Sequence, residues 1–312
     1  MDEAVNYIFS GQGSQEEGMG REIMKNAKAA QIVRSLTGVF GMDMENLVCA
    51  TNMDILKKTR FTQPAIFAVQ AAYFEAVRDI VPDLKIVATA GNSLGTYMSL
   101  VVSGSMDLEG AARLLDARAQ AMGIACERRP STLRAFRADR KFVEQLISRA
   151  GNLWVALVNT PGQIIVGGTL EAFANLDRLL AAEGYNPEDE ANEFKMKELE
   201  VEGAFHTEIM RSGIDIFEKA LEKAEIRSPE LDYFSDTSGK LEKDPDRIRS
   251  LLLDQITQPV EWEKCIRSMA EKCTTFLEAS NRCVVAGMIE AIDLDYDVEM
   301  SSTLEEIEDW VE

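Results

Sequence analysis

The segment GNSLG at 91–95 carries the residue with the clearest chemical potential, the Ser93 hydroxyl. An apolar run typical of a strand precedes it at 86–90, and a helix pattern follows it at 96–105. The sequence G-x-S-x-G between a strand and a helix is typical of a nucleophile elbow, a turn too tight for side chains on either side of the serine. The helix start directs N–H groups and a positive dipole end to the same point. The alternative is a plain glycine turn that opens a helix.

A serine hydroxyl needs a base to act as a nucleophile, and His206 is the only histidine in the chain. It lies 113 residues after Ser93, where a loop can return to the carboxyl edge of a sheet. In hydrolases an acidic residue orients the histidine. No acidic residue between the two stands out for that role, and a backbone carbonyl can serve as well. The alternative is a structural histidine.

A glycine loop, GQGSQ at 11–15, follows the first predicted strand. A Rossmann fingerprint would need glycine where Glu16 stands, and a P-loop would need lysine where Met19 stands. Both nucleotide-binding interpretations are therefore excluded. A loop of this kind can instead supply a backbone N–H to an oxyanion hole, paired with the N–H of Leu94.

Arg118 lies on a predicted helix at 107–122, 25 residues after Ser93, among mostly small or apolar neighbours. An arginine that faces a pocket binds a carboxylate through two parallel hydrogen bonds. The alternative is an ordinary surface ion pair.

Strands and helices alternate along most of the chain, with short connections that contain glycine. Such alternation predicts a parallel sheet covered by helices on both faces. The predicted strands of this part are 5–9, 86–90 and 274–279, and the predicted helices are 63–80, 96–105, 107–122, 207–225 and 261–272, with one more before the acidic tail.

The middle of the chain has a different order of elements, β-α-β-β-α-β, which is the split ferredoxin-like unit. The predicted strands are 132–139, 152–160, 163–168 and 194–201, the helices are 140–151 and 170–184, and an acidic loop at 186–193 precedes the last strand. We therefore predict an α/β fold. Its α/β-hydrolase-like body with a parallel sheet comprises 1–127 and 203–312, and a ferredoxin-like subdomain is inserted at 128–202.

Composition narrows the class of protein. The chain is 46% hydrophobic and 28% charged, which is ordinary for a packed globule. It has no apolar run long enough for a membrane span and no signal-peptide pattern at its start. Its five cysteines are scattered and never form CxxC, so we expect a reduced, cytoplasmic protein without a zinc site. The net charge of −20 argues against nucleic acid as a partner.

The charge is unevenly distributed. Ten Asp or Glu and no Lys or Arg lie from Glu290 onward, and we expect this tail to be a solvated surface. A basic cluster has the opposite sign and comprises Arg128, Arg129, Arg134 and Arg137, with further basic residues at 140 and 141. Such a cluster on an acidic protein can steer an anionic partner. The alternative is a set of ion pairs at helix ends and on the surface.

Seven segments resemble malonyl-CoA:acyl carrier protein transacylases and polyketide-synthase acyltransferases in order and spacing. They are FSGQGSQEEGMG, FTQPAIFAVQ, GNSLGTYMSLVVSG, RLLDARAQAM, VNTPGQIIVGG, GAFH and DQITQPVEW. The resemblance runs from about residue 5 to 290 and implies the same α/β body with a ferredoxin-like insert.

The resemblance implies roles for the catalytic residues. Ser93 matches the serine that becomes acylated, and His206 matches the catalytic histidine. Gln12 and Leu94 match the residues whose backbone N–H groups form the oxyanion hole. Gln255 matches the residue whose backbone carbonyl holds the histidine.

The resemblance also implies substrate contacts. Arg118 matches the arginine that pairs with the free carboxylate of malonyl-type groups, and Phe205 resembles the malonyl-selecting form of its motif. Asn159 and Gln163 lie in the matching strand pair, near the cleft. Asn92, beside the nucleophile, stands where the family usually has histidine. Glutamate is likewise usual where Thr96 stands, so an altered acyl unit is an open alternative.

The implied activity is transfer of a malonyl-type acyl group from CoA to the phosphopantetheine thiol of an acyl carrier protein through an acyl-serine, as a stand-alone enzyme of fatty acid or polyketide synthesis. We expect a monomer that needs no metal or bound cofactor and that contacts the carrier through the basic cluster. The alternatives are an acyl hydrolase on the same fold, which clears acyl groups from carriers, and a non-catalytic docking protein.

Overall fold

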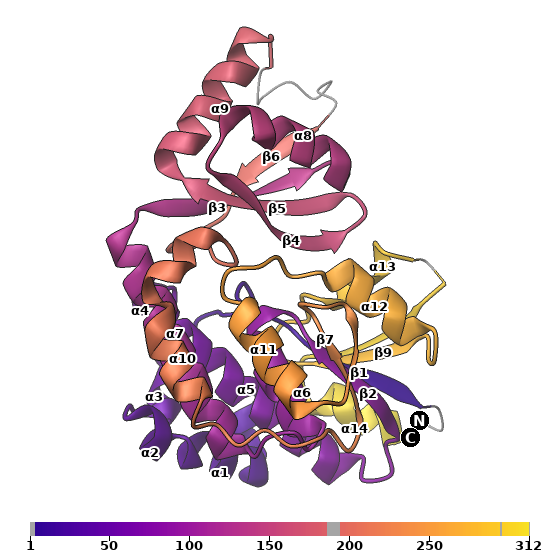
Figure 1. Ribbon diagram of the computed structural model, residues 1–312. Coiled ribbons are helices and arrows are strands. Elements are labelled where there is room, and N and C mark those ends of the chain that lie inside the picture. The colour runs from indigo at the N-terminus through magenta and orange to yellow at the C-terminus, as the bar shows by residue number, and fades with distance from the viewer. Residues whose placement is uncertain (1–3, 186–193, 294, 312) are drawn as a thin grey trace.

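The structure is a computed structural model that describes residues 4–185, 194–293 and 295–311. Two separate sheets organise it, one in the body of the molecule and one in an insert that lies above the body in Figure 1. This arrangement confirms the predicted α/β class with an inserted second unit. The acidic loop predicted at 186–193 lies outside the described residues.

The body sheet has six strands in the order β10-β9-β1-β2-β7-β8. All neighbouring pairs are parallel except β7 and β8, which form an antiparallel hairpin. The predicted parallel sheet is therefore confirmed, with one antiparallel strand at its edge. The strands are β1 (Val5–Phe9), β2 (Ile86–Gly91), β7 (Asp232–Ser235), β8 (Lys240–Glu242), β9 (Thr275–Ala279) and β10 (Asp297–Ser301).

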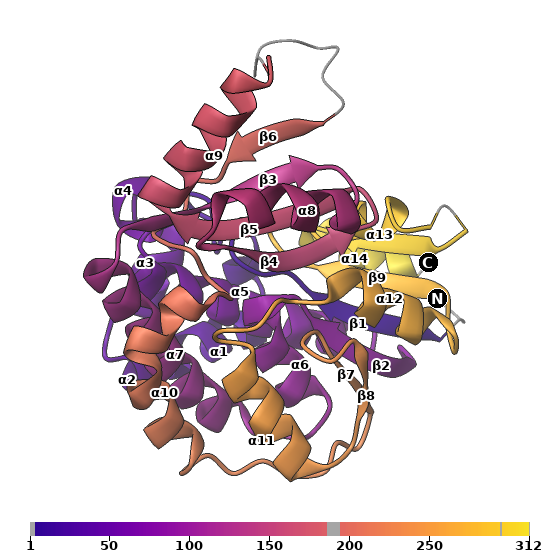
Figure 2. The ribbon, with the colours of Figure 1, turned by 45° about the horizontal axis from the view of Figure 1, so that its top comes forward.

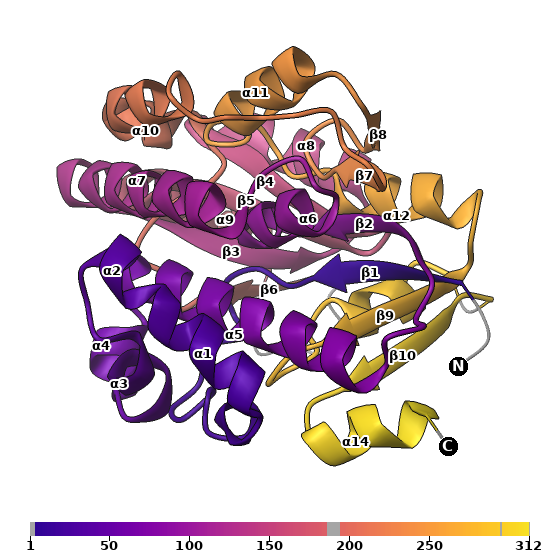
Figure 3. The same cartoon turned by 90° about the horizontal axis from the view of Figure 1, so that it is seen from below.

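Apolar side chains on both faces explain why β1 lies inside the sheet. Val5, Tyr7 and Phe9 belong to the core that contains α5, whereas Ile8 belongs to the core that contains α12. A strand buried on both faces is typical of a parallel sheet covered by helices. Figure 3 shows the layer of α1 and α5 beside the sheet.

Several helices of the body begin at clear capping residues. The side chain of Asp107 accepts a hydrogen bond from the N–H of Gly110 and caps α7, as the sequence predicted from its Asp start. The helices are α1 (Ala27–Ser35), α2 (Thr37–Phe40), α3 (Met44–Cys49), α4 (Met53–Leu56), α5 (Thr59–Ile80), α6 (Thr96–Val102), α7 (Leu108–Arg128), α10 (Ile214–Leu221), α11 (Pro245–Asp254), α12 (Trp262–Ala270), α13 (Ala286–Glu290) and α14 (Leu304–Glu308).

The insert is a four-stranded antiparallel sheet in the order β4-β5-β3-β6, with two helices packed on one face (Figure 2). Its elements are β3 (Ser131–Arg137), α8 (Arg140–Ala150), β4 (Leu153–Thr160), β5 (Gln163–Thr169), α9 (Leu170–Ala182) and β6 (Lys195–Glu198). The order βαββαβ confirms the ferredoxin-like prediction, while the domain boundaries at 127/128 and 202/203 stay predictions.

Alternation along β3 gives the insert sheet two different faces. Phe136 belongs to the core under α8 and α9, whereas Leu133 and Ala135 line a cavity that also contains Ser93. The insert is joined to the body through β4, because the N–H of Val158 bonds the carbonyl of Val260 at 2.8 Å. The second face of the insert sheet therefore forms one wall of the site.

Two expectations were wrong. The predicted helix at 207–225 is a 3-10 turn, Glu208–Gly213, followed by the shorter α10. A Cβ built on Gly213 would lie 2.0 Å from the carbonyl oxygen of Ala121 on α7, so the chain approaches that helix too closely for a side chain.

The acidic tail is the second correction. Instead of remaining a solvated surface throughout, it adds β10 to the sheet in parallel with β9 and buries Ile307 of α14. Parallel pairing with β9 and the apolar contacts of Ile307 thus hold part of this tail on the body. Across the described ranges, no helix combines the length and apolar character needed to span a membrane.

Candidate active site

The nucleophile-elbow geometry explains both glycines around Ser93. Ser93 has a φ of 52°, in the left-handed region, two residues after the end of β2. A Cβ built on Gly91 would lie 1.9 Å from the backbone carbon of Gly95, and one built on Gly95 would lie 2.4 Å from the carbonyl oxygen of Phe9. Neither position can hold a side chain without moving backbone. The turn therefore presents the serine at the carboxyl end of the strand, as the sequence predicted.

His206 meets Ser93 directly. The serine Oγ lies 2.7 Å from His206 Nε2, and Nδ1 lies 2.7 Å from the carbonyl oxygen of Gln255. A carbonyl only accepts, so Nδ1 carries the proton and Nε2 is left to accept from the serine hydroxyl. His206 also has a positive φ, 59°, and is 3% exposed.

The environment keeps the imidazole neutral. Burial, together with the nearby Arg118 charge, lowers the pKa of His206 from 6.5 to about 3, against the opposing effect of the Gln255 carbonyl. The ring is therefore unprotonated at neutral pH and can take a proton from Ser93.

Arg118 is fully buried in α7 and points at the same hydroxyl. Its Nη2 lies 2.9 Å from Ser93 Oγ and 3.2 Å from Gln255 Oε1, and its guanidinium carbon lies 5.7 Å from the ring centroid of Tyr97. Among the described residues, Nε and Nη1 have no hydrogen-bond partner. Burial lowers the pKa of Arg118. A buried guanidinium with unused donors suits an anionic ligand.

A cavity of about 210 Å³ lies between the body and the insert and brings together seven of the ten predicted catalytic and substrate-binding residues, whereas Leu94, Arg118 and Gln255 are not part of its lining. Its lining includes Gln12, Asn92, Ser93, Asn159, Gln163, Phe205 and His206. The rest of the lining is apolar: Leu133, Ala135, Leu157, Ile165, Leu199, Val201 and Met288. The cavity is a mostly apolar channel with a few polar groups, which is typical of a small-molecule site.

The glycine loop and the strand pair reach this cavity from opposite sides. A Cβ built on Gly11 would lie 2.8 Å from the carbonyl oxygen of Asn92, so the loop that carries Gln12 packs against the elbow. In the insert, Asn159 Nδ2 donates to Gln163 Oε1 at 2.9 Å. Leu94, predicted beside Gln12 in the oxyanion hole, is buried directly after Ser93.

The basic cluster does not line this cavity, and its members differ in what they contact. Arg134 pairs with Asp177 at 2.6 Å and lies over the ring of Phe173. Its charge is therefore largely neutralised by contacts within the insert. Arg128 donates to the carbonyl of Ser212. Arg129 and Arg137 are exposed.

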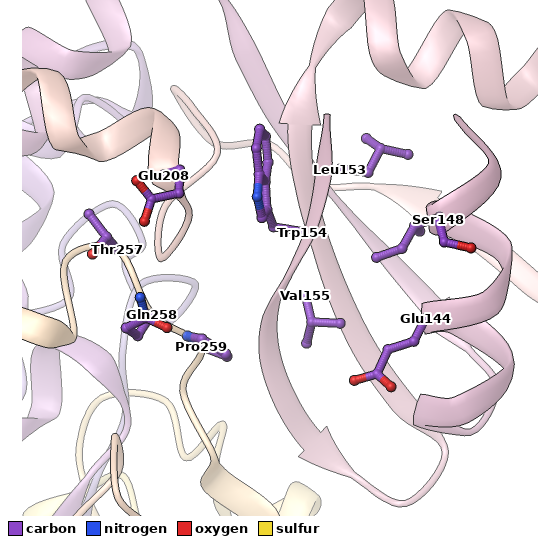
Figure 4. A pocket seen from close by; sticks show the side chains of 10 residues that line it. Glu144, Ser148, Leu153, Trp154, Val155, Glu208, Thr257, Gln258 and Pro259 are labelled. Carbon is purple, nitrogen blue, oxygen red and sulfur yellow. The ribbon is translucent and has the colours of Figure 1, made fainter. Parts of the chain in front are cut away.

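A second cavity, of about 420 Å³, holds none of the predicted residues. Figure 4 shows Glu208 and Thr257 on one side of it and Glu144 and Ser148 on the other, with Trp154 between them. It has no nucleophile–base pair of the kind seen at Ser93. No cluster of three or more metal-ligating side chains is present in the described ranges.

Sequence reasoning missed Asp236, a buried carboxyl next to the elbow. Its Oδ2 accepts a hydrogen bond from the Ser93 N–H at 2.7 Å. The signal for it was its place, directly after an apolar strand, because carboxyl ends of neighbouring parallel strands meet at one edge of a sheet. That β7 lies beside β2 was not evident from sequence.

Comparison with known proteins agrees with this geometry. The family model of the acyl transferase domain matches residues 6–301. The chain is 27% identical over 298 residues to the malonyl CoA-acyl carrier protein transacylase of Bacillus subtilis, covering 93% of this chain and 90% of that protein. It is 28% identical over 296 residues to a polyketide biosynthesis malonyl CoA-acyl carrier protein transacylase of Bacillus velezensis, covering 92% and 96%.

A solved structure extends the likeness to three dimensions. The crystal structure of malonyl CoA-acyl carrier protein transacylase from Clostridium perfringens matches with a TM-score of 0.89 and 26% identity, over 99% of this chain and 96% of that one. Sequence, fold and the geometry around Ser93 agree. The chain therefore belongs to the acyl transferase domain family.

Proposed function

We propose that this chain is an acyltransferase that moves a malonyl-type group from CoA to the phosphopantetheine thiol of an acyl carrier protein. The observation that carries the proposal is the convergence of His206 Nε2 and Arg118 Nη2 on Ser93 Oγ, at 2.7 and 2.9 Å. It gives one hydroxyl both a base and a buried cation for an acyl carboxylate. The names of the two relatives, one of them from polyketide biosynthesis, support the same substrates.

The first half-reaction acylates Ser93. His206 takes the hydroxyl proton while Oγ attacks the thioester carbonyl, and the carbonyl oxygen becomes an oxyanion between the N–H groups of Gln12 and Leu94. The C–S bond then breaks, and the proton held by His206 passes to the leaving CoA sulfur. Loss of one oxyanion donor costs about 10²–10³ in rate in studied enzymes.

The second half-reaction transfers the acyl group to the carrier and regenerates the free Ser93 hydroxyl. The carrier thiol gives its proton to His206 and attacks the acyl ester, and the proton then passes to Ser93 Oγ as the ester bond breaks. The low pKa of His206, about 3, means that the ring gives up the proton after each transfer and returns to its neutral form. This is ping-pong chemistry with a covalent intermediate.

Arg118 binds the free carboxylate of the acyl group in this mechanism. Its Nε and Nη1 donors have no partner among the described residues, so they are available to an anionic ligand, which supports that role. Phe205, Asn92, Asn159 and Gln163 contact the acyl group or the pantetheine arm. Their place on the lining of the 210 Å³ cavity supports these contacts.

The carrier docks near the basic cluster. Carrier proteins of this kind are acidic, and the net charge of −20 repels them everywhere except at local basic patches. Exposed Arg129 and Arg137 are the members best placed to contribute, whereas Arg134 is already paired with Asp177. The cytoplasmic location, the monomeric state and the absence of a cofactor stay predictions.

A transfer assay tests the proposal. The enzyme is mixed with malonyl-CoA and a phosphopantetheinylated acyl carrier protein, and malonyl-carrier and free malonate are measured together. Malonyl-carrier is expected as the main product. Free malonate as the main product in the presence of carrier would contradict transfer and favour hydrolysis.

A further inference from the structure

The buried carboxyl group of Asp236 contacts the backbone of the nucleophile, Ser93. The strand β7 pairs in parallel with β2 on the side away from β1 (Figure 1). Asp236 follows β7 directly and is 1% exposed. Its Oδ2 accepts the backbone N–H of Ser93 at 2.7 Å. The residue whose hydroxyl reacts is therefore held at its main chain by a side chain 143 positions away.

The same carboxyl group holds Gln255. Gln255 Nε2 lies 2.9 Å from Asp236 Oδ1 and 3.0 Å from Oδ2. An ionised carboxylate only accepts hydrogen bonds, so it fixes which end of the Gln255 amide faces it. With Nε2 turned toward Asp236, Oε1 faces Arg118 Nη2 at 3.2 Å.

Gln255 also holds the base, because its backbone carbonyl lies 2.7 Å from His206 Nδ1. One residue thus links the guanidinium, the imidazole and the buried carboxylate. We propose that Asp236 is a positioning residue for acyl transfer, which fixes the Ser93 backbone and the Gln255 amide and so aligns Arg118 and His206 on the serine hydroxyl. This inference rests on the proposed function.

An amide cannot replace this carboxylate. If the side-chain amide introduced by Asp236→Asn used its oxygen to accept from Ser93 N–H, its NH₂ group would face Gln255. The Gln255 amide would then turn its oxygen toward position 236 and its NH₂ toward Arg118 Nη2, which is also a donor. Two donors would oppose each other in a buried site, where an unmet hydrogen bond is costly. Arg118 would move away from Ser93.

The ionisation of Asp236 makes the proposal testable through pH. Burial raises the pKa of Asp236 from 3.8 to about 6, while hydrogen bonds from Gln255, Ser93 N–H and Thr96 and the charge of Arg118 oppose that rise. The titratable groups that interact with it are Arg118, Tyr97, Tyr233 and Cys265. Burial raises the pKa of each tyrosine and of the thiol, so Arg118 is the charged one among them at neutral pH.

Protonation of Asp236 removes an acceptor from Ser93 N–H or from Gln255, so acylation slows as the pH falls through about 6. The His206 ring does not cause this loss, because its pKa of about 3 lies well below that range. The experiment measures the rate of acyl-Ser93 formation from malonyl-CoA by quenched-flow intact-protein mass spectrometry between pH 4.5 and 8. It compares the wild type, Asp236→Asn and a matched control, Asp232→Asn, which removes a carboxylate from the same strand at a partly exposed position paired with Lys243.

The wild type and Asp232→Asn are expected to lose rate about tenfold per pH unit below pH 6. Asp236→Asn is expected to be roughly tenfold to a hundredfold slower at pH 7.5, the size of effect that misplaced reacting groups produce. Its acylation rate is also expected to show no decrease as the pH falls through about 6. Asp236→Asn within twofold of the wild type, or slower but with that decrease retained, would overturn the proposal.

Two further outcomes are covered by the same measurements. If Asp236→Asn does not fold, judged by circular dichroism, the wild-type profile decides, and a rate that stays level from pH 7 to 5 overturns the proposal. If the wild type forms no acyl-serine at any pH, the proposed function itself fails. That result is distinct from an active wild type that is indifferent to position 236.

Discussion

Ser93 and His206 share a backbone conformation that is rare outside glycine, with φ values of 52° and 59°, and their side chains meet at 2.7 Å. A positive φ in a non-glycine residue costs of order 1–3 kcal/mol and persists only where the surroundings enforce it. At Ser93 the close backbone approaches at Gly91 and Gly95 enforce it. Among the described residues, the one other non-glycine residue with a positive φ is Asn152 in the insert, so two of these three residues are the ones proposed to carry the chemistry.

The elbow glycines make a prediction about stability. Gly95→Ala places a methyl group 2.4 Å from the carbonyl oxygen of Phe9, so backbone must move. We expect a loss of roughly 3 kcal/mol in the free energy of unfolding by overpacking, measured by urea denaturation. Gly123→Ala is the matched control, because nothing lies within 4 Å of its added Cβ, and it should gain about 0.5–1 kcal/mol as a helix residue. Equal effects of the two substitutions would contradict the close approach.

Arg118→Ala tests the carboxylate site. Truncation of one partner of a buried charge pair costs roughly 2–5 kcal/mol, so transfer of malonyl should fall about 30-fold or more in kcat/KM, whereas transfer of acetyl, which has no free carboxylate, should fall much less. Arg113→Ala is the control, since this exposed residue of the same helix pairs with Glu109, whereas Arg118 contacts Ser93. A similar loss with both acyl groups would refute a carboxylate-specific role.

Glu278 gives a prediction for stability against pH. Burial raises the pKa of this carboxyl from 4.5 to about 7. A group with a raised folded-state pKa contributes stability that is present below about pH 4.5 and is lost as the pH rises through about 7. Glu278→Gln cannot ionise, so relative to the wild type it should become more stable between pH 5 and 8.5, by on the order of 3 kcal/mol.

Urea denaturation at both pH values measures this difference, with Glu271→Gln as an exposed control that should show no such change. If the difference in the free energy of unfolding between Glu278→Gln and the wild type is the same at pH 5 and at pH 8.5, the Glu278 carboxyl does not titrate between these pH values.

Charge reversal at Arg129 and Arg137 tests carrier docking. Both side chains are exposed and lie outside the cavity, so Arg129→Glu with Arg137→Glu should raise KM for the carrier severalfold and leave acyl-Ser93 formation from CoA unchanged. The rise should shrink as salt is added, because exposed charges are screened. Reversal at Arg178, an exposed residue on α9, is the control. Unchanged carrier kinetics in the double variant would remove the docking proposal.

The sequence predicted the features whose cause is local. The elbow follows from glycines that no other residue can replace, and the base follows because the chain has one histidine. The insert follows from alternating apolar patterns, which place Leu133 and Phe136 on opposite faces of one strand. The contact between His206 and the Gln255 carbonyl was implied by the resemblance to a family rather than by any residue pattern.

The features that the sequence did not predict depend on contacts across the chain. Asp236 reaches Ser93 only because β7 pairs with β2, and nothing in its own segment indicates that pairing. The apolar period of 207–225 continues through Gly213, so the break there follows from the approach to Ala121 on α7. The strand β10 in the acidic tail has few buried residues, and it is held by backbone hydrogen bonds to β9. Because backbone pairing does not depend on residue type, the composition of the tail did not indicate this strand.

The most direct test of the central claim is mass spectrometry of the protein after mixing with malonyl-CoA, followed by peptide mapping. The account predicts one malonyl group on the peptide that contains Ser93, no adduct on Ser93→Ala, and discharge of the adduct when a phosphopantetheinylated carrier is added. An adduct on another residue, or equal labelling of Ser93→Ala, would contradict it.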